Sequence, residues 1–100
     1  MLHIINKSPF ERSAFSSCLS HAKSGDSILM IEDAILAAVK NSSYSSLIKL
    51  AIKDKTLYVL APDLYARGLL QARIIENIEL VDYAGFVNLV VDNETNQSWL

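Results

Sequence analysis

Apolar residues alternate along the chain between short continuous runs and longer segments with helical spacing. Four short runs, at residues 2–5, 28–31, 56–60 and 78–81, are rich in aliphatic and β-branched residues and predict β-strands. The run Ile28–Ile31 contains no polar residue, which is typical of a parallel strand covered on both faces. We therefore expect a parallel sheet at the centre of the fold.

The best-defined helix follows the first strand. Ser8-Pro9-Phe10-Glu11 has the pattern of a capping box, in which Ser8 and Glu11 exchange hydrogen bonds and Pro9 takes the first helical position. Gly25 is the expected C-terminal cap of this helix. Apolar residues three and four positions apart predict its buried face: Phe10, Ala14, Phe15, Cys18, Leu19 and Ala22.

Two helices are predicted in the middle of the chain. Asp33 is placed to cap a helix from Ala34 to about Lys40, and residues 41–46 are polar and predict a loop. Leu47–Ile52 can form a short helix after that loop. Both segments lie between the second and third predicted strands.

Two more helices are predicted in the last third of the chain. One begins at Pro62-Asp63 and ends at Gly68. Asp82 can cap the other, which presents Phe86, Leu89 and Val90, although its valines also suit a strand. Residues 92–98 are polar and precede Trp99-Leu100.

Strand and helix alternation predicts an α/β fold built from βαβ units. We expect one domain, residues 1–100, with a small parallel sheet of about four strands and helices on both faces. The chain has no internal repeat and no segment that resembles a domain linker.

Composition and charge limit the function. Nine basic and eleven acidic residues give a formal charge of −2, which argues against direct binding of nucleic acid. No apolar run approaches the ~20 residues that span a bilayer, and the first residues do not resemble a signal peptide. The single cysteine, Cys18, cannot form an internal disulfide, which fits the reducing cytoplasm.

Most patterns of catalysis and cofactor binding are absent. The chain has no Gly-x-Gly-x-x-Gly motif and no phosphate-binding loop, and one cysteine with two histidines, His3 and His21, does not make a zinc site. We therefore predict no cofactor and no metal. Glu32-Asp33 follows a strand, so it could be a carboxylate pair for metal or acid–base chemistry, but helix capping by Asp33 explains it more simply.

Three other side chains have both a chemical and a structural interpretation. Cys18 is the only strong nucleophile, but its spacing predicts a small buried side chain in the helix core. Arg67 could recognise a substrate, or it could form an intrahelical ion pair with Asp63, four residues earlier. His3, in the first strand, is expected to be a structural histidine.

The chain resembles the DsrH/TusB family along almost all of its sequence, both in its size and in the order of its segments. No single motif carries the resemblance, but the order of the segments is specific. They are Leu2-His3, Asn6–Phe10, Ile31–Ala34, Ala37-Ala38, Tyr58–Leu60, Asp63-Leu64, Ala66–Gly68, Val81–Val87 and Ser98–Leu100.

The resemblance implies a DsrE-like α/β fold and a role in a cytoplasmic sulfur relay. Family members assemble with DsrE/TusD-like and DsrF/TusC-like subunits into a heterohexamer that exchanges persulfide sulfur with small sulfur-carrier proteins. The Tus branch serves 2-thiolation of the wobble uridine in tRNA, and the Dsr branch serves dissimilatory sulfur oxidation. The main sulfur-carrying cysteine belongs to the DsrE/TusD subunit, whereas some Dsr members have a cysteine in the first helix, where Cys18 lies. Cys18 is therefore a candidate persulfide carrier.

The few charged residues predict apolar surface that a partner covers, since a domain of this size leaves about a third of its chain surface exposed. The candidate segments are Ile35–Val39, Leu69-Leu70 and, as the interface residues, Trp99 and Leu100. Two alternatives of another class remain open. One is a stand-alone small-molecule enzyme near Glu32 and Asp33, and the other is a redox sensor built on Cys18.

Overall fold

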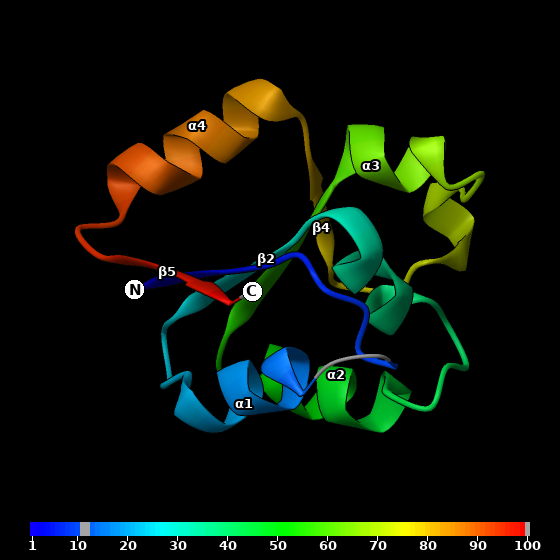
Figure 1. Cartoon of the computed structure of the whole chain (residues 1–100), viewed down its shortest axis with the longest axis horizontal. Helices are drawn as coiled ribbons and strands as arrows, with labels where there is room; N and C mark the ends of the chain where they lie inside the picture. Colours follow the sequence, from blue (N-terminus) through cyan, green and yellow to red (C-terminus); the bar gives the residue numbers. More distant parts are fainter. Residues whose placement is uncertain (11–12, 100) are drawn as a thin grey trace.

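The computed structural model describes residues 1–10 and 13–99. Its centre is a sheet of five parallel strands in the order β4-β3-β2-β1-β5 (Figure 1). All neighbouring pairs run parallel, which confirms the predicted fold class. The strands are β1 (Leu2–Ile5), β2 (Ser27–Met30), β3 (Thr56–Leu60), β4 (Glu79–Val81) and β5 (Asn96–Trp99).

Helices cover both faces of this sheet. In Figure 1, α1 and α2 lie on one side of the sheet, and α3 and α4 lie on the other. The helical elements are α1 (Ala14–His21), the 3₁₀ helix η1 (Glu32–Ala38), α2 (Ser45–Ile52), α3 (Ala61–Ala66), the 3₁₀ turn η2 (Gln71–Arg73) and α4 (Tyr83–Asp92). No helix in the described part of the chain is long and apolar enough to cross a membrane.

The main hydrophobic core lies between the sheet and the helices α1 and α2. Side chains alternate between the two faces of a strand, so every second residue of β1, β2 and β3 points into this core. The strand residues of the core are Ile5, Ile28, Met30, Leu57 and Val59. From the helices, Phe15, Cys18 and Ile48 pack against them, all essentially without solvent exposure.

Strand β5 was not predicted, so the sheet has five strands instead of about four. Three of its four residues are polar, and it pairs with β1 from Leu2–Asn96 to Ile5–Trp99. Backbone hydrogen bonds hold an edge strand of this kind, so its side chains need not be apolar. Hydrophobic periodicity therefore gave no signal for it.

The first helix begins later than predicted. Ser8 accepts a hydrogen bond from the Phe10 amide (3.2 Å), and α1 starts only at Ala14. Glu11, the other half of the expected capping box, lies outside the described residues. Phe10, expected in the buried face, is exposed and makes a T-shaped ring contact with Tyr44, with ring centroids 5.4 Å apart.

Gly25 does not cap α1, which ends at His21 with Ala22 as its C-cap. It lies instead in the turn before β2, with φ +88°, and its amide donates to the Asp54 carbonyl (2.7 Å). The left-handed conformation explains why glycine occupies the position. This hydrogen bond links the loop that follows α1 to the loop that follows α2.

Two predicted helix ends are confirmed. Asp82 caps α4 by accepting a hydrogen bond from the Gly85 amide (2.8 Å). Gly68, with φ +71°, ends α3 in a Schellman motif: its amide donates to the Tyr65 carbonyl and the Leu69 amide donates to the Leu64 carbonyl. Both signals involve residues a few positions apart, which is why the sequence revealed them.

Candidate functional site

Cys18 lies in the middle of α1 with no solvent-exposed surface. Burial raises the pKa of its thiol to about 12, and the nearby negative charge of Asp26 adds to the shift. A thiol with such a pKa carries almost no thiolate at neutral pH, and the thiolate is the nucleophile. The position agrees with the buried side chain that the helical spacing of Cys18 predicts.

A polar cluster lies at the edge of the sheet where β1 and β2 begin, on the face that α1 covers. His3, which is only 2% exposed, is bonded at both ring nitrogens. Its Nδ1 is 3.1 Å from Nε1 of Trp99, and its Nε2 is 2.9 Å from Oδ2 of Asp26. Because an indole N–H can only donate, Nδ1 accepts and the ring proton lies on Nε2, which donates to Asp26.

Asp26 receives three hydrogen bonds in this cluster. They come from His3, from the amide of Lys23 (2.9 Å) and from the amino group of Met1 (3.3 Å). Burial raises the pKa of the carboxyl, but the hydrogen bonds outweigh that effect and hold the pKa at about 2. The sequence interpretation treated His3 as structural and missed these partners, which lie 23 and 96 residues away along the chain.

Glu32 and Asp33, the predicted carboxylate pair, lie at the carboxyl edge of β2 in η1. The expected α-helix from Ala34 to Lys40 is instead a 3₁₀ helix that starts at Glu32, and Asp33 does not cap it. The Glu32 backbone is left-handed (φ +50°), and its amide donates to Oδ2 of Asp63 in α3 (2.8 Å). Asp63, from a different element, therefore takes the role that Asp33 was predicted to have.

Arg67 pairs with Asp33 and not with the Asp63 carboxylate. Its Nε and Nη2 lie 3.2 and 3.0 Å from Oδ1 of Asp33. Its Nη1 donates to the backbone carbonyl of Asp63 (3.1 Å), while the Asp63 carboxylate accepts from the Glu32 amide. The predicted ion pair within α3 is therefore wrong.

These hydrogen bonds link η1 to α3 at the edge of the sheet where the strands end, which we call the carboxyl edge. The Asp33 and Asp63 carboxylates and Arg67 all have partners within the chain. Within residues 1–10 and 13–99, no three His, Cys, Asp or Glu side chains gather in a way that could hold a metal ion. The geometry favours a role in positioning the two helices over acid–base chemistry at this edge.

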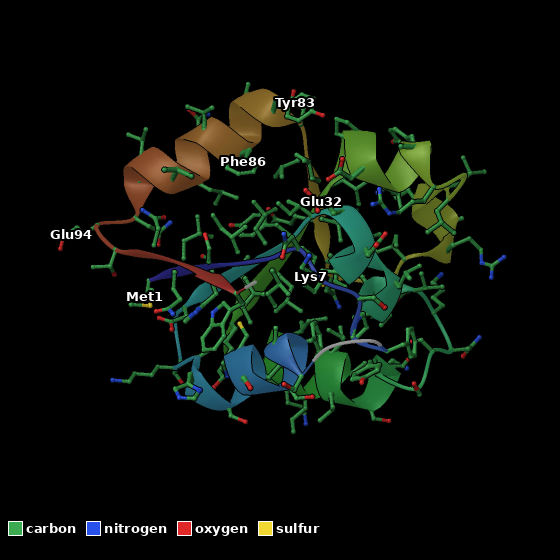
Figure 2. The ribbon with its side chains drawn as sticks, in the orientation of Figure 1. Met1, Lys7, Glu32, Tyr83, Phe86 and Glu94 are labelled. Atoms are coloured by element: carbon green, nitrogen blue, oxygen red, sulfur yellow. The ribbon has the colours of Figure 1, made fainter. Side chains whose placement is uncertain are left out.

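Helix α4 exposes apolar residues on its outer side. It has no buried residue, although its sequence, YAGFVNLVVD, is mostly apolar. Phe86 lies on the sheet side of the helix, and Tyr83 lies on the outer side of its first turn (Figure 2). The outer residues Tyr83, Val87 and Val91 recur every four positions and are 62%, 58% and 74% exposed. We call these three residues the α4 stripe.

The predicted exposed segments agree with the structure only in part. Ile35, Ala37 and Ala38 are fully buried, so the segment Ile35–Val39 belongs mainly to the core. Leu70 is exposed as predicted. Trp99 is partly buried and bonded to His3, with its ring 5.4 Å from that of His21, while Leu100 lies outside the described residues. The α4 stripe was missed because its spacing also suits a helix packed in the core.

Comparison with known proteins identifies the family. A family model described as DsrH like protein matches residues 7–96. The chain belongs to the DsrH family. It is 39% identical to a protein TusB of Erwinia tasmaniensis and 37% identical to a protein TusB of Escherichia coli K12, in each case over 99% of this chain and all of the relative. A protein TusB of Buchnera aphidicola from Baizongia pistaciae is 35% identical, also over 99% of this chain and all of the relative.

Solved structures with low sequence identity share the fold of this DsrH-family chain. The ychN protein from Escherichia coli superposes with a TM-score of 0.83 at 10% identity and covers 97% of both chains. The MTH1491 protein from Methanobacterium thermoautotrophicum superposes with a TM-score of 0.71 at 13% identity and covers 97% of this chain and 95% of its own. These likenesses agree with the all-parallel sheet described above.

Proposed function

We propose that this chain is a non-catalytic subunit of a cytoplasmic sulfur relay of the TusBCD type. In this role it supports the transfer of persulfide sulfur towards 2-thiolation of the wobble uridine in tRNA. Membership of the DsrH family supports the relay, and relatives named TusB at 35–39% identity favour the tRNA branch over dissimilatory sulfur oxidation. The partners are a DsrE/TusD-like and a DsrF/TusC-like subunit in a heterohexamer, together with small sulfur-carrier proteins.

The α4 stripe is the observation that carries this proposal. A helix as apolar as α4 normally buries one face, yet α4 has no buried residue and leaves Tyr83, Val87 and Val91 in solvent. Contiguous exposed apolar residues on a small domain mark protein interfaces. A subunit that works only within an assembly needs such a surface, whereas a stand-alone enzyme does not.

The surroundings of Cys18 support an accessory role within that assembly. A persulfide carrier must present a thiolate to a sulfur donor, and this thiol is fully buried with a pKa raised to about 12. At the carboxyl edge, the Asp33 carboxylate is paired with Arg67 and the Asp63 carboxylate accepts from the Glu32 amide, so both carboxylates have structural partners. The transferred sulfur is therefore held by a cysteine of the DsrE/TusD-like partner.

Co-expression with the two DsrE-like subunits tests the assembly. Val87→Asp places a charge in the α4 stripe and should abolish co-purification of the complex, because an unpaired charge would be buried at the interface. The matched control is Asn88→Asp, which adds the same charge to the next exposed position of the same helix. A complex that forms equally well with both variants would contradict the proposed interface.

Mass spectrometry of the assembled complex tests the role of Cys18. After incubation with a persulfide donor, we expect one added sulfur atom on the DsrE/TusD-like subunit and none on this chain. Unfolding the chain in urea before the incubation should expose Cys18 and allow the adduct to form, which is the positive control. An adduct on the native chain that is lost in Cys18→Ser would instead make Cys18 a carrier.

A further inference from the structure

A basic depression lies beside α2, away from the α4 stripe. Its volume of about 540 Å³ falls within the range of about 300–1,000 Å³ typical of small-molecule sites. It is lined by residues from α2 and from the chain segments on either side of the Val39–Ile74 bridge. The lining residues are Lys40, Asn41, Lys49, Ile52, Lys53, Ile75, Glu76 and Asn77.

The charge of this depression is opposite to that of the whole chain. Three lysines against one glutamate give the lining a net charge of +2, whereas the chain has a formal charge of −2. In the described part of the chain, Lys55 and Arg67 each pair with a carboxylate, but Lys40, Lys49 and Lys53 do not. Lys49 lies in α2 and Lys53 is its C-cap, four residues later, so their charges repel each other unless an anion lies between them.

The backbone holds the walls of the depression in place. The Lys40 amide donates to the Arg73 carbonyl (2.8 Å), and the Ile75 amide donates to the Ala38 carbonyl (2.9 Å). Asn41 and Asn77 both have left-handed backbones, with φ +62° and +71°. Both residues line the depression, and each side chain carries an amide donor.

We propose that this depression binds a small phosphate-bearing molecule. Lysine ammonium groups bind phosphate as point charges, and the asparagine amides can donate to its oxygen atoms. Ile52 and the nearly buried Ile75 offer an apolar wall for an organic part of the ligand. A nucleic-acid duplex would need a basic surface that extends beyond this pocket, which the negative chain does not provide.

Such a ligand could bind while the subunit is assembled. The helix α2 lies on the opposite side of the sheet from α4 (Figure 1). A partner confined to the α4 face therefore does not cover the depression. The ligand site and the assembly surface can consequently be tested independently, and the failure of one does not imply the failure of the other.

Calorimetric titration of the full chain with inorganic triphosphate at low ionic strength tests this proposal. We expect saturable binding of one triphosphate that weakens as salt is added. Lys49→Gln and Lys53→Gln should each weaken binding about tenfold, since each removes one charge-assisted contact. Lys23→Gln, which removes a lysine outside the depression, should bind as the unchanged chain does.

Titrations with ATP and with a short RNA distinguish which kind of molecule carries the phosphate group. Tighter binding of ATP than of triphosphate supports a nucleotide, and equal binding supports recognition of the phosphates alone. The proposal is overturned if triphosphate does not saturate, or if the lysine variants of the depression bind as Lys23→Gln does. Tighter binding of a short RNA than of either small ligand would also overturn it. Circular dichroism of each variant checks that the chain remains folded.

Discussion

Helices α1 and α4 lie on opposite faces of the same sheet and differ in what they bury (Figure 1). The helix α1 is rich in serine, yet it places Phe15 and Cys18 entirely in the core. The helix α4 is more apolar and buries no residue. Apolar content alone therefore does not tell whether a helix is packed within its own chain or is available to a partner.

The strands show the same difference between the two faces. On the α1 face of β1 and β3, Ile5, Leu57 and Val59 are essentially without solvent exposure. On the opposite face of the same strands, Leu2 and Leu60 are also buried, but Ile4 and Tyr58 remain partly exposed. The isolated subunit thus covers one face of these strands fully and the other face only in part.

The largest difference between the two helices should appear on removing an aromatic ring. Phe15→Ala empties a buried site and should lower the free energy of unfolding by about 3–5 kcal/mol. Tyr83→Ala removes a ring of similar size from the exposed α4 stripe and should change it by less than about 0.5 kcal/mol. Urea denaturation of the isolated chain measures both values, and similar costs would refute the contrast between the two faces.

The polar cluster beneath α1 should add a smaller contribution. Asp26→Asn removes a charged acceptor of three hydrogen bonds and should lower the free energy of unfolding by about 1.5–3 kcal/mol at pH 7. Because folding lowers the Asp26 pKa from 3.8 to about 2, this contribution is present above pH 3.8 and is lost as the pH falls through 2.

Glu94→Gln is the control for Asp26→Asn, since it removes a charge from an exposed position after α4 (Figure 2). Its stability should follow that of the unchanged chain across the whole pH range. If the gap between Asp26→Asn and the unchanged chain persisted below pH 2, the stabilisation would not come from the ionised carboxylate.

The smallest effect should come from the side-chain hydrogen bond between Trp99 of β5 and His3 of β1. Trp99→Phe removes the indole N–H and leaves Nδ1 of His3 without its donor. The free energy of unfolding should therefore fall by about 0.5–1.5 kcal/mol. The same change in a His3→Phe background should cost less, because the acceptor is already absent. Equal costs in the two backgrounds would mean that Trp99 stabilises the strand by packing alone.

Local signals in the sequence predicted most elements correctly. The continuous apolar run of β2, the Asp82 cap and the Gly68 terminus depend on residues that lie close together along the chain. The burial of Cys18 was also predictable, because helical spacing places it beside Phe15 and Leu19. These features follow from backbone periodicity and capping, which act over one or two turns.

Only the tertiary structure decided which distant groups meet. The sequence by itself determined the parallel α/β fold and the caps of α3 and α4, because short-range spacing encodes them. Pairing of Arg67 with Asp33, capping of η1 by Asp63 and the bond from Trp99 to His3 join groups 31 to 96 residues apart. An arginine can reach any nearby carboxylate, and a polar edge strand can pair through its backbone alone, so only the folded arrangement selects the partner.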